Sequence, residues 1–252
     1  MSEEPRINWQ VPATFPTLHT REIHLWCAWL GPDDGAAAPD QDCLSPDEWA
    51  RADAFHFAVD RVRFIAARRN LRQVLARYTG HDPARLAFNY GRFGKPLLAH
   101  QAITTNQLAP AVSDLMFNQS HCGALWLLAV AWHQPLGVDV EQVREVSDLY
   151  LLESRIFSAD ELFVQRSLPH PERRLAFFRR WTEREATVKF HGLGFDPDKP
   201  CLPPGRSELL HPTANSVATL AYGGAAVRFG QFQWSPDLRR ENVPEAAEAA
   251  LS

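Results

Sequence analysis

The chain has 252 residues, of which 45% are hydrophobic and 22% charged, a composition typical of a soluble globular protein with a sizeable core. Its net charge of -4 gives no overall attraction to nucleic acid or to anionic membranes. The longest apolar run, 124–132, is too short to cross a bilayer, and residues 1–15 lack the pattern of a secretion signal. The four cysteines contain no Cys-x-x-Cys pair. We therefore expect a cytoplasmic protein with reduced thiols and with neither a nucleic-acid nor a membrane partner.

An arm, a strand and a helical region open the chain. Residues 1–20 are rich in Pro and Thr and indicate an irregular arm, and the alternating residues 23–29 predict a strand. The segment Ser45-Pro-Asp-Glu48 has the residues of a capping box with Pro at the first helical position, so it predicts a helix start. Apolar residues then recur at roughly helical intervals as far as Gly80, and the stretch 60–72 is strongly basic.

Strands and loops follow this helical region. Residues 86–90 predict a strand that runs into a loop of Gly and Pro at 91–96. Residues 117–121 lead into an apolar strand at 124–132. The first half of the chain therefore mixes helices with strands.

The second half repeats the order of the first. Ser158 to Glu161 repeats the helix start of Ser45 to Glu48, and residues 136–139 stand at the same offset from the strand residues 23–26. This repetition predicts an α+β fold made of two similar halves, related by a pseudo-twofold axis, with a seam near residues 133–136. We expect four segments, namely an N-terminal arm (1–20), a first half (21–133), a second half (134–235) and a solvated C-terminal tail (236–252).

Two acidic residues lie inside the apolar segment Gly137-Val-Asp-Val-Glu141. Because side chains alternate along a strand, Val138 and Val140 can enter the core while Asp139 and Glu141 share the other face. The two carboxylates are then about 6–7 Å apart along the strand. A hard divalent cation such as Mg²⁺ suits such oxygen ligands. The alternative is a strand end whose acids point into water.

A helix further along the chain adds a third carboxylate. Phe178, Trp181, Glu185 and Lys189 recur every three or four residues and therefore share one face. Glu185 and Lys189 could form an exposed ion pair worth about 0.3–0.5 kcal/mol. Their place on an aromatic stripe instead favours a partly buried site, in which Glu185 joins the two strand acids around Mg²⁺ and Lys189 faces a phosphate.

Taken in order, these motifs resemble the Sfp-type 4'-phosphopantetheinyl transferases. The resemblance covers roughly residues 20–200 and is carried by 45–51 (SPDEWAR), 60–68 (DRVRFIAAR), 93–96 (FGKP), 117–121 (FNQSH), 137–141 (GVDVE), 181–189 (WTEREATVK) and 192–194 (GLG). It implies a pseudo-dimer of two α/β halves with the active site at the seam, and we expect a monomer. It also implies an enzyme that uses Mg²⁺ to move the phosphopantetheine arm of coenzyme A onto a serine of an apo carrier protein (acyl, peptidyl or aryl), releasing adenosine 3',5'-bisphosphate.

The resemblance also implies roles for single residues. The residues that match the magnesium ligands are Asp139, Glu141 and Glu185. Glu185 also matches the residue that helps to deprotonate the serine. Lys189 matches a lysine that lies near the pyrophosphate. Those that match the coenzyme A contacts are Gly94, Lys95, Pro96, Ser120 and His121. The 3'-phosphate needs a further cation, for which Arg51 and the basic stretch that contains Arg63 are the candidates.

Two positions depart from the family pattern. Arg184 stands where the family usually has a lysine, and a guanidinium differs from an ammonium in reach and geometry. Glu48 stands where some members have a phosphate-binding lysine, so Arg51 or a neighbour must carry more of the 3'-phosphate.

Residues 23–26 lack an acid pair, so one active site is expected. A metal-dependent nuclease and a carrier-binding relative without turnover remain as alternatives, and the carrier itself is not identified.

Overall fold

The computed structural model describes residues 6–31, 43–99, 114–193, 205–224 and 228–238. The strands are β1 (Glu22–Trp29), β2 (Phe88–Tyr90), β3 (Pro96–Leu98), β4 (Leu115–Cys122), β5 (Leu125–Trp132), β6 (Leu136–Gln142), β7 (Arg206–Thr213), β8 (Ser216–Tyr222) and β9 (Arg228–Gln233). The helices are α1 (Pro46–Asp53), α2 (Ala58–Thr79), α3 (Leu149–Ile156), α4 (Ala159–Ser167) and α5 (His170–His191). The chain is therefore a mixed α+β protein, as the sequence predicts. Within the described ranges no helix is long and apolar enough to cross a membrane.

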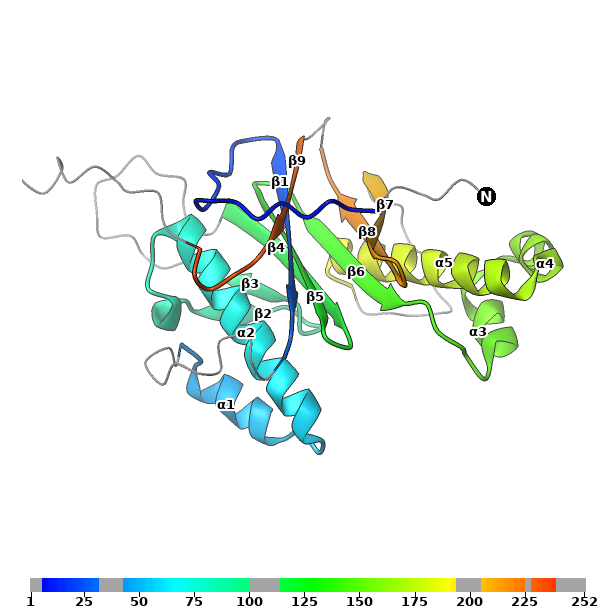
Figure 1. The fold of residues 1–252 in the computed structure, drawn as a ribbon, viewed down its shortest axis with the longest axis horizontal. Coiled ribbons are helices and arrows are strands. Elements are labelled where there is room, and N and C mark those ends of the chain that lie inside the picture. Colours follow the sequence, from blue (N-terminus) through cyan, green and yellow to red (C-terminus); the bar gives the residue numbers. More distant parts are fainter. Residues whose placement is uncertain (1–5, 32–42, 100–113, 194–204, 225–227, 239–252) are drawn as a thin grey trace, which may run out of the picture.

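Two sheets form the centre of the molecule, with α1 and α2 to one side and α3, α4 and α5 to the other (Figure 1). The larger sheet has the order β4-β5-β1-β9, and the smaller has the order β6-β8-β7. All neighbours in these sheets are antiparallel except β1 and β9, which run parallel. The strand β9, which the sequence places in the second half, therefore returns to the sheet of the first half.

The larger sheet is buried on both faces, which explains the continuous apolar run of β5. Trp126, Leu128 and Val130 enter a core shared with α2, while Leu127 and Ala129 enter a core shared with β6 and β8. Alternate residues of one strand thus serve two different cores, so the strand has no polar face.

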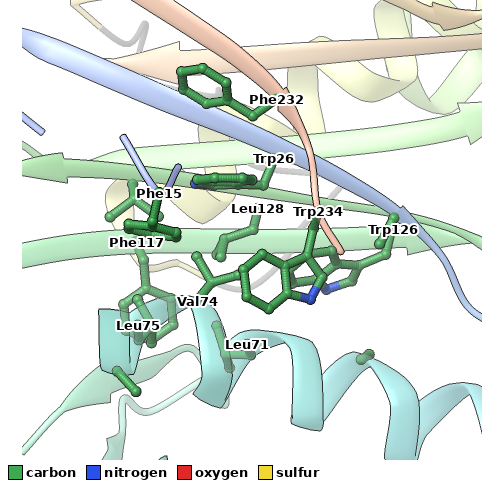
Figure 2. Close-up of a cluster of buried hydrophobic side chains, with 14 of the residues drawn as sticks. Phe15, Trp26, Leu71, Val74, Leu75, Phe117, Trp126, Leu128, Phe232 and Trp234 are labelled. Carbon is green, nitrogen blue, oxygen red and sulfur yellow. The ribbon is translucent and has the colours of Figure 1, made fainter. Parts of the chain in front are cut away.

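The expected N-terminal arm closes the first core. Phe15 stacks on Trp26 with ring centroids 5.1 Å apart (Figure 2). Trp234 donates from Nε1 to Asn70 Oδ1 at 3.1 Å. Leu238 is also buried, so the start of the expected tail packs against the core, and residues 239–252 lie outside the described ranges. The N-terminal arm and the start of the tail are both held by contacts with residues that are distant in the sequence.

Both predicted helix starts are confirmed. The Glu48 carboxylate accepts a hydrogen bond from the Ser45 amide at 3.0 Å, and the Glu161 carboxylate accepts one from the Ser158 amide at 2.8 Å. A 22-residue helix, α2 or α5, follows in each half. Both long helices end at a glycine in the left-handed conformation, a common helix terminus.

The helical region between Ser45 and Gly80 is broken, although the sequence pattern shows no break. α1 ends at Asp53 and α2 begins at Ala58. The break lets α1 fold back against α2, where the Glu48 carboxylate pairs with Arg68 and Arg72. This ion triad is buried, and a buried carboxylate needs such partners.

Candidate active site

A cavity of about 400 Å³ opens between the two halves and gathers residues from both. Its lining combines the basic and aromatic side chains of the first half with polar side chains of β4, β6 and α5. The lining residues are Arg51, Phe64, Ala67, Arg68, Tyr90, Gly94, Pro96, Gln119, Ser120, His121, Trp126, Asp139 and Lys189. The predicted site residues Arg51, Gly94, Pro96, Ser120, His121, Asp139 and Lys189 thus meet at one cavity.

Side chains bridge β4 and β6, which lie side by side in different sheets. The Asn118 side chain accepts a hydrogen bond from the Val138 amide at 2.8 Å, and the Ser120 hydroxyl donates to Asp139 Oδ1 at 2.9 Å. The Cys122 thiol lies 3.4 Å from Glu141 Oε2. Because side chains alternate along β4, these three residues share the face toward β6. Their contacts hold Asp139 and Glu141 at the seam between the two sheets.

Lys189 and Asp139 form the polar centre of the site. The Lys189 ammonium donates to Asp139 Oδ1 at 2.6 Å, to the Ser120 hydroxyl at 3.1 Å and to the Val138 carbonyl at 3.2 Å. Asp139 is only 5% exposed, so the alternative of an acid that points into water is wrong for this residue. Its second oxygen, Oδ2, is buried and has no hydrogen-bond partner among the described residues. One buried carboxylate oxygen is therefore left for a ligand.

The three acids lie within electrostatic reach of one another. Burial raises the pKa of Glu141 and of Glu185, and the nearby charge of Asp139 raises both pKa values further. A cation between these carboxylates would relieve this repulsion. Oxygen donors and an unpartnered buried oxygen fit a hard divalent ion such as Mg²⁺. As the side chains stand, however, no group of three acidic, His or Cys residues in the described ranges is arranged as a closed metal site.

A close contact between helix and strand brings Glu185 and Lys189 to the two strand acids. Gly137 faces the backbone of α5, and a Cβ atom at this position would lie 1.9 Å from the Ala186 carbonyl oxygen. The hydroxyls of Thr182 and Thr219, 3.0 Å apart, join α5 to β8. α5 therefore lies directly on β6, with its functional residues at the seam.

Arg51 and aromatic rings form the first-half wall of the cavity. The guanidinium of Arg51 lies 5.5 Å from the centroid of Phe64 and 5.6 Å from that of Tyr90. Arg68 donates to the Tyr90 hydroxyl at 3.0 Å and pairs with the buried Glu48. Glu48 thus fixes Arg68 beside the cavity and does not itself line it. The sequence pattern did not reveal this role, because Arg68 lies 20 positions further along the chain.

Other predicted residues, among them Glu141 and Glu185, lie outside this lining. Arg63 approaches Asp60 at 4.0 Å on the surface of α2. Lys95 points its ammonium at the backbone of the second half. Arg184 donates to the Arg155 carbonyl at 3.0 Å, near the end of α3. Gly194, of the last motif, lies outside the described ranges.

Several cavity residues were not singled out by sequence reasoning. Tyr90 and Trp126 both line the cavity, and Asn118 orients β6. The alternation of β4 offered a signal for Asn118, since it shares a face with Ser120. No comparable local signal pointed to the two aromatic residues, which reach the cavity through sheet packing.

Two family models and several known proteins match this chain. A family model described as the 4'-phosphopantetheinyl transferase superfamily matches residues 135–240, and one described as 4'-phosphopantetheinyl transferase, N-terminal, matches residues 32–133. The chain is 36% identical over 234 residues to the 4'-phosphopantetheinyl transferase HetI of Nostoc sp. strain PCC 7120, covering 87% of this chain and 92% of the relative. It is 27% identical over 166 residues to the 4'-phosphopantetheinyl transferase psf-1 of Bacillus pumilus, covering 64% and 65%. A 4'-phosphopantetheinyl transferase of Bacillus subtilis is 26% identical over 152 residues, covering 60% and 61%.

The fold and the site thus define an α+β protein with a cavity between two halves, lined by arginine, lysine and a buried carboxylate. The chain belongs to the 4'-phosphopantetheinyl transferase superfamily and is a 4'-phosphopantetheinyl transferase.

Proposed function

We propose that this enzyme transfers 4'-phosphopantetheine from coenzyme A to a serine of an apo acyl, peptidyl or aryl carrier protein, with Mg²⁺, and releases adenosine 3',5'-bisphosphate. The observation that carries the proposal is the single cavity whose lining includes both Asp139 with Lys189 and Arg51 among aromatic rings. This arrangement suits a ligand with a pyrophosphate and a phosphorylated nucleoside. We also propose that the two halves are related by a pseudo-twofold axis, because both carry a capped helix followed by a 22-residue helix.

The transfer would proceed by attack of the serine oxygen on the phosphorus that carries pantetheine. The new P–O bond forms as the bond to the bridging oxygen of the pyrophosphate breaks, and adenosine 3',5'-bisphosphate leaves with the bonding electrons. Glu185 would accept the serine proton, directly or through water. Lys189 would neutralise the charge that develops on the leaving phosphate. Asp139, Glu141 and Glu185 would hold Mg²⁺, which supplies further charge neutralisation.

A mass-shift assay tests this proposal directly. The enzyme would be incubated with coenzyme A, Mg²⁺ and a panel of apo carriers from fatty-acid, polyketide and peptide synthesis. At least one carrier is expected to gain the mass of phosphopantetheine, while its serine-to-alanine variant gains none. Failure to modify any member of a broad panel would contradict the proposal.

Arg51 is expected to recognise the 3'-phosphate of coenzyme A. Arg51→Ala should weaken the binding of coenzyme A about tenfold to a hundredfold, because a charge-assisted hydrogen bond is worth roughly 1.5–3 kcal/mol. The binding of 3'-dephospho-coenzyme A should change much less. Calorimetric titration of both ligands checks this, with Arg63→Ala as the matched control, since Arg63 lies outside the cavity lining. Equal losses for both ligands would instead assign Arg51 to the fold or the carrier.

The carrier is expected to dock on α3 and α4 of the second half. The apolar residues of 148–158 recur at helical spacing and are candidates for this surface, but the structure buries Leu149 and Ile156 and packs Leu152 and Phe157 against the same core. These residues point inward because apolar residues at helical spacing share one face, and that face packs against the core. The exposed apolar residues of these helices, which we call the docking surface, are Tyr150 (59% exposed), Leu151 (63%), Phe163 (81%) and Val164 (61%).

Phe163→Ser should raise the Michaelis constant for the carrier roughly tenfold and leave that for coenzyme A unchanged, as expected for one interface anchor. Because Phe163 is exposed, the melting temperature should not fall. Val11→Ser, at an apolar residue that is 71% exposed on the N-terminal arm, is the control. Unchanged carrier kinetics in both Phe163→Ser and Leu151→Ser would place the docking face elsewhere.

A further inference from the structure

Lys95 differs from its neighbours in the turn between β2 and β3. Its neighbours line the cavity, whereas its side chain points away from it. Gly94 and Pro96 border the cavity, whereas Lys95 is absent from its lining. Two backbone hydrogen bonds of 2.9 Å, from Gly94 to Gly91 and from Gly91 to Lys95, close the turn. Gly94 has a φ of +79°, which glycine adopts at little cost. The turn therefore fixes the direction in which the Lys95 side chain points, which is toward the second half.

The Lys95 ammonium joins two elements of the second half. It donates to the Lys189 carbonyl oxygen at 2.6 Å and to the Leu136 carbonyl oxygen at 2.9 Å. Leu136 begins β6, and Lys189 lies in the last turn of α5. The last carbonyls of a helix carry the negative end of its dipole, so a cation there is favourable. One side chain thus holds an end of each of the two elements that carry Asp139 and Lys189.

These two contacts lie where α5 and β6 approach most closely. Gly137, next to Leu136, has no room for a Cβ atom because the α5 backbone is in contact with it. Asp139 follows two residues later and accepts the Lys189 side chain at 2.6 Å. A shift of the helix end relative to the strand start would therefore change the distance between the Lys189 ammonium and the Asp139 carboxylate.

The partial burial of Lys95 favours keeping its ammonium hydrogen-bonded to these carbonyls. Burial, together with the nearby positive charge of Lys189, lowers the pKa of Lys95 to about 8. A buried ammonium is unfavourable unless its hydrogen bonds are formed. Rotation of Lys95 toward a phosphate in the cavity would break both hydrogen bonds to the second half.

We propose that Lys95 is a positioning residue, whose ammonium aligns the Lys189 ammonium and the Asp139 carboxylate for phosphoryl transfer and does not itself contact the nucleotide. This assignment replaces the role in coenzyme A binding that the resemblance implies for Lys95. It rests on the proposed function, because phosphoryl transfer is the step that needs the alignment.

Lys95→Met tests the assignment, since it keeps the length of the side chain and removes the ammonium. We expect kcat for an apo carrier to fall about 100-fold, as misplaced reacting groups can cause. The Kd of coenzyme A, measured by calorimetry, should stay within about twofold, because binding and chemistry are separated. Lys95→Arg keeps the cation and its donors and should recover part of the lost kcat. Arg92→Met removes an exposed cation of the same turn and should leave all constants unchanged.

A double-mutant cycle with Lys189→Met separates positioning from an independent effect. If Lys95 acts through Lys189, adding Lys95→Met to Lys189→Met should cause no further loss of kcat. Additive losses would overturn the inference, and so would a rise of tenfold or more in the Kd of coenzyme A at unchanged kcat. A decrease in melting temperature together with weaker coenzyme A binding and a lower kcat would also overturn it, because Lys95 would then only stabilise the fold. An inactive wild type would contradict the proposed function and the inference together, whereas these results with an active wild type contradict the inference alone.

Discussion

Asp139→Asn is expected to reduce phosphopantetheine transfer by about 1000-fold, because it removes the charge of the buried carboxylate at the centre of the site. The substitution keeps the shape of the side chain, so β6 should keep its place against β4. The melting temperature without metal should not fall, since the lost ion pair with Lys189 is offset by relief of repulsion with Glu141 and Glu185. Transfer rates from the mass-shift assay and a thermal melt would measure both effects.

Metal binding provides a second readout for the same variant. A ligand that binds only the folded state raises the melting temperature. Mg²⁺ should therefore stabilise the wild type and have little effect on Asp139→Asn. Asp53→Asn, at an exposed acid of α1 that pairs with Arg61, is the matched control and should behave as the wild type. Wild-type transfer rates in Asp139→Asn, with Mg²⁺ as the only metal, would remove Asp139 from the site.

The other two acids should differ in their sensitivity. Glu185→Ala should nearly abolish transfer, because it removes both a metal ligand and the proposed base. Glu141→Ala should be the most tolerant of the three, because water can replace an outer ligand. The structure agrees with a peripheral Glu141, since its carboxylate contacts the Cys122 thiol at the end of β4.

Gly137→Ala is expected to lower the free energy of unfolding by about 3 kcal/mol or more, toward the upper end for overpacking in a core. The new Cβ atom would lie 1.9 Å from the Ala186 carbonyl oxygen and 2.5 Å from the Phe190 amide nitrogen. Both atoms belong to the backbone of α5, so no side chain can rotate away, and the helix must leave the strand. Denaturant unfolding checks the loss, and a folded variant should also show reduced transfer, because Lys189 would move away from Asp139.

A second glycine serves as the control for this prediction. A Cβ atom added at Gly91 would meet the Lys95 carbonyl oxygen at 3.7 Å, an ordinary van der Waals contact. Gly91→Ala should therefore change the free energy of unfolding by less than about 1 kcal/mol. If Gly137→Ala were as stable as Gly91→Ala, the close contact between β6 and α5 would not exist in solution.

Local signals in the sequence were enough to predict several elements. The capping boxes at Ser45 and Ser158 mark helix starts because their hydrogen bonds form within four residues. The alternation in 137–141 placed Val138 and Val140 in the core, where both are almost fully buried. Periodicity also placed Glu185 and Lys189 on the side of α5 that reaches the seam, since residues four apart share a helix face.

The sequence by itself thus determined several strands, the two helix starts and which polar side chains share a face, because these properties depend on neighbours along the chain, whereas β7, β8, β9 and the break between α1 and α2 were not predicted. Only the tertiary structure decided that Glu48 is enclosed by Arg68 and Arg72, that Lys95 binds the Lys189 and Leu136 carbonyls, and that β9 returns to β1. These contacts join segments far apart in the sequence, and each needs two surfaces to meet. An ammonium or a carboxylate looks the same in the sequence whether it will face a ligand or a buried partner, and the packing around it decides which.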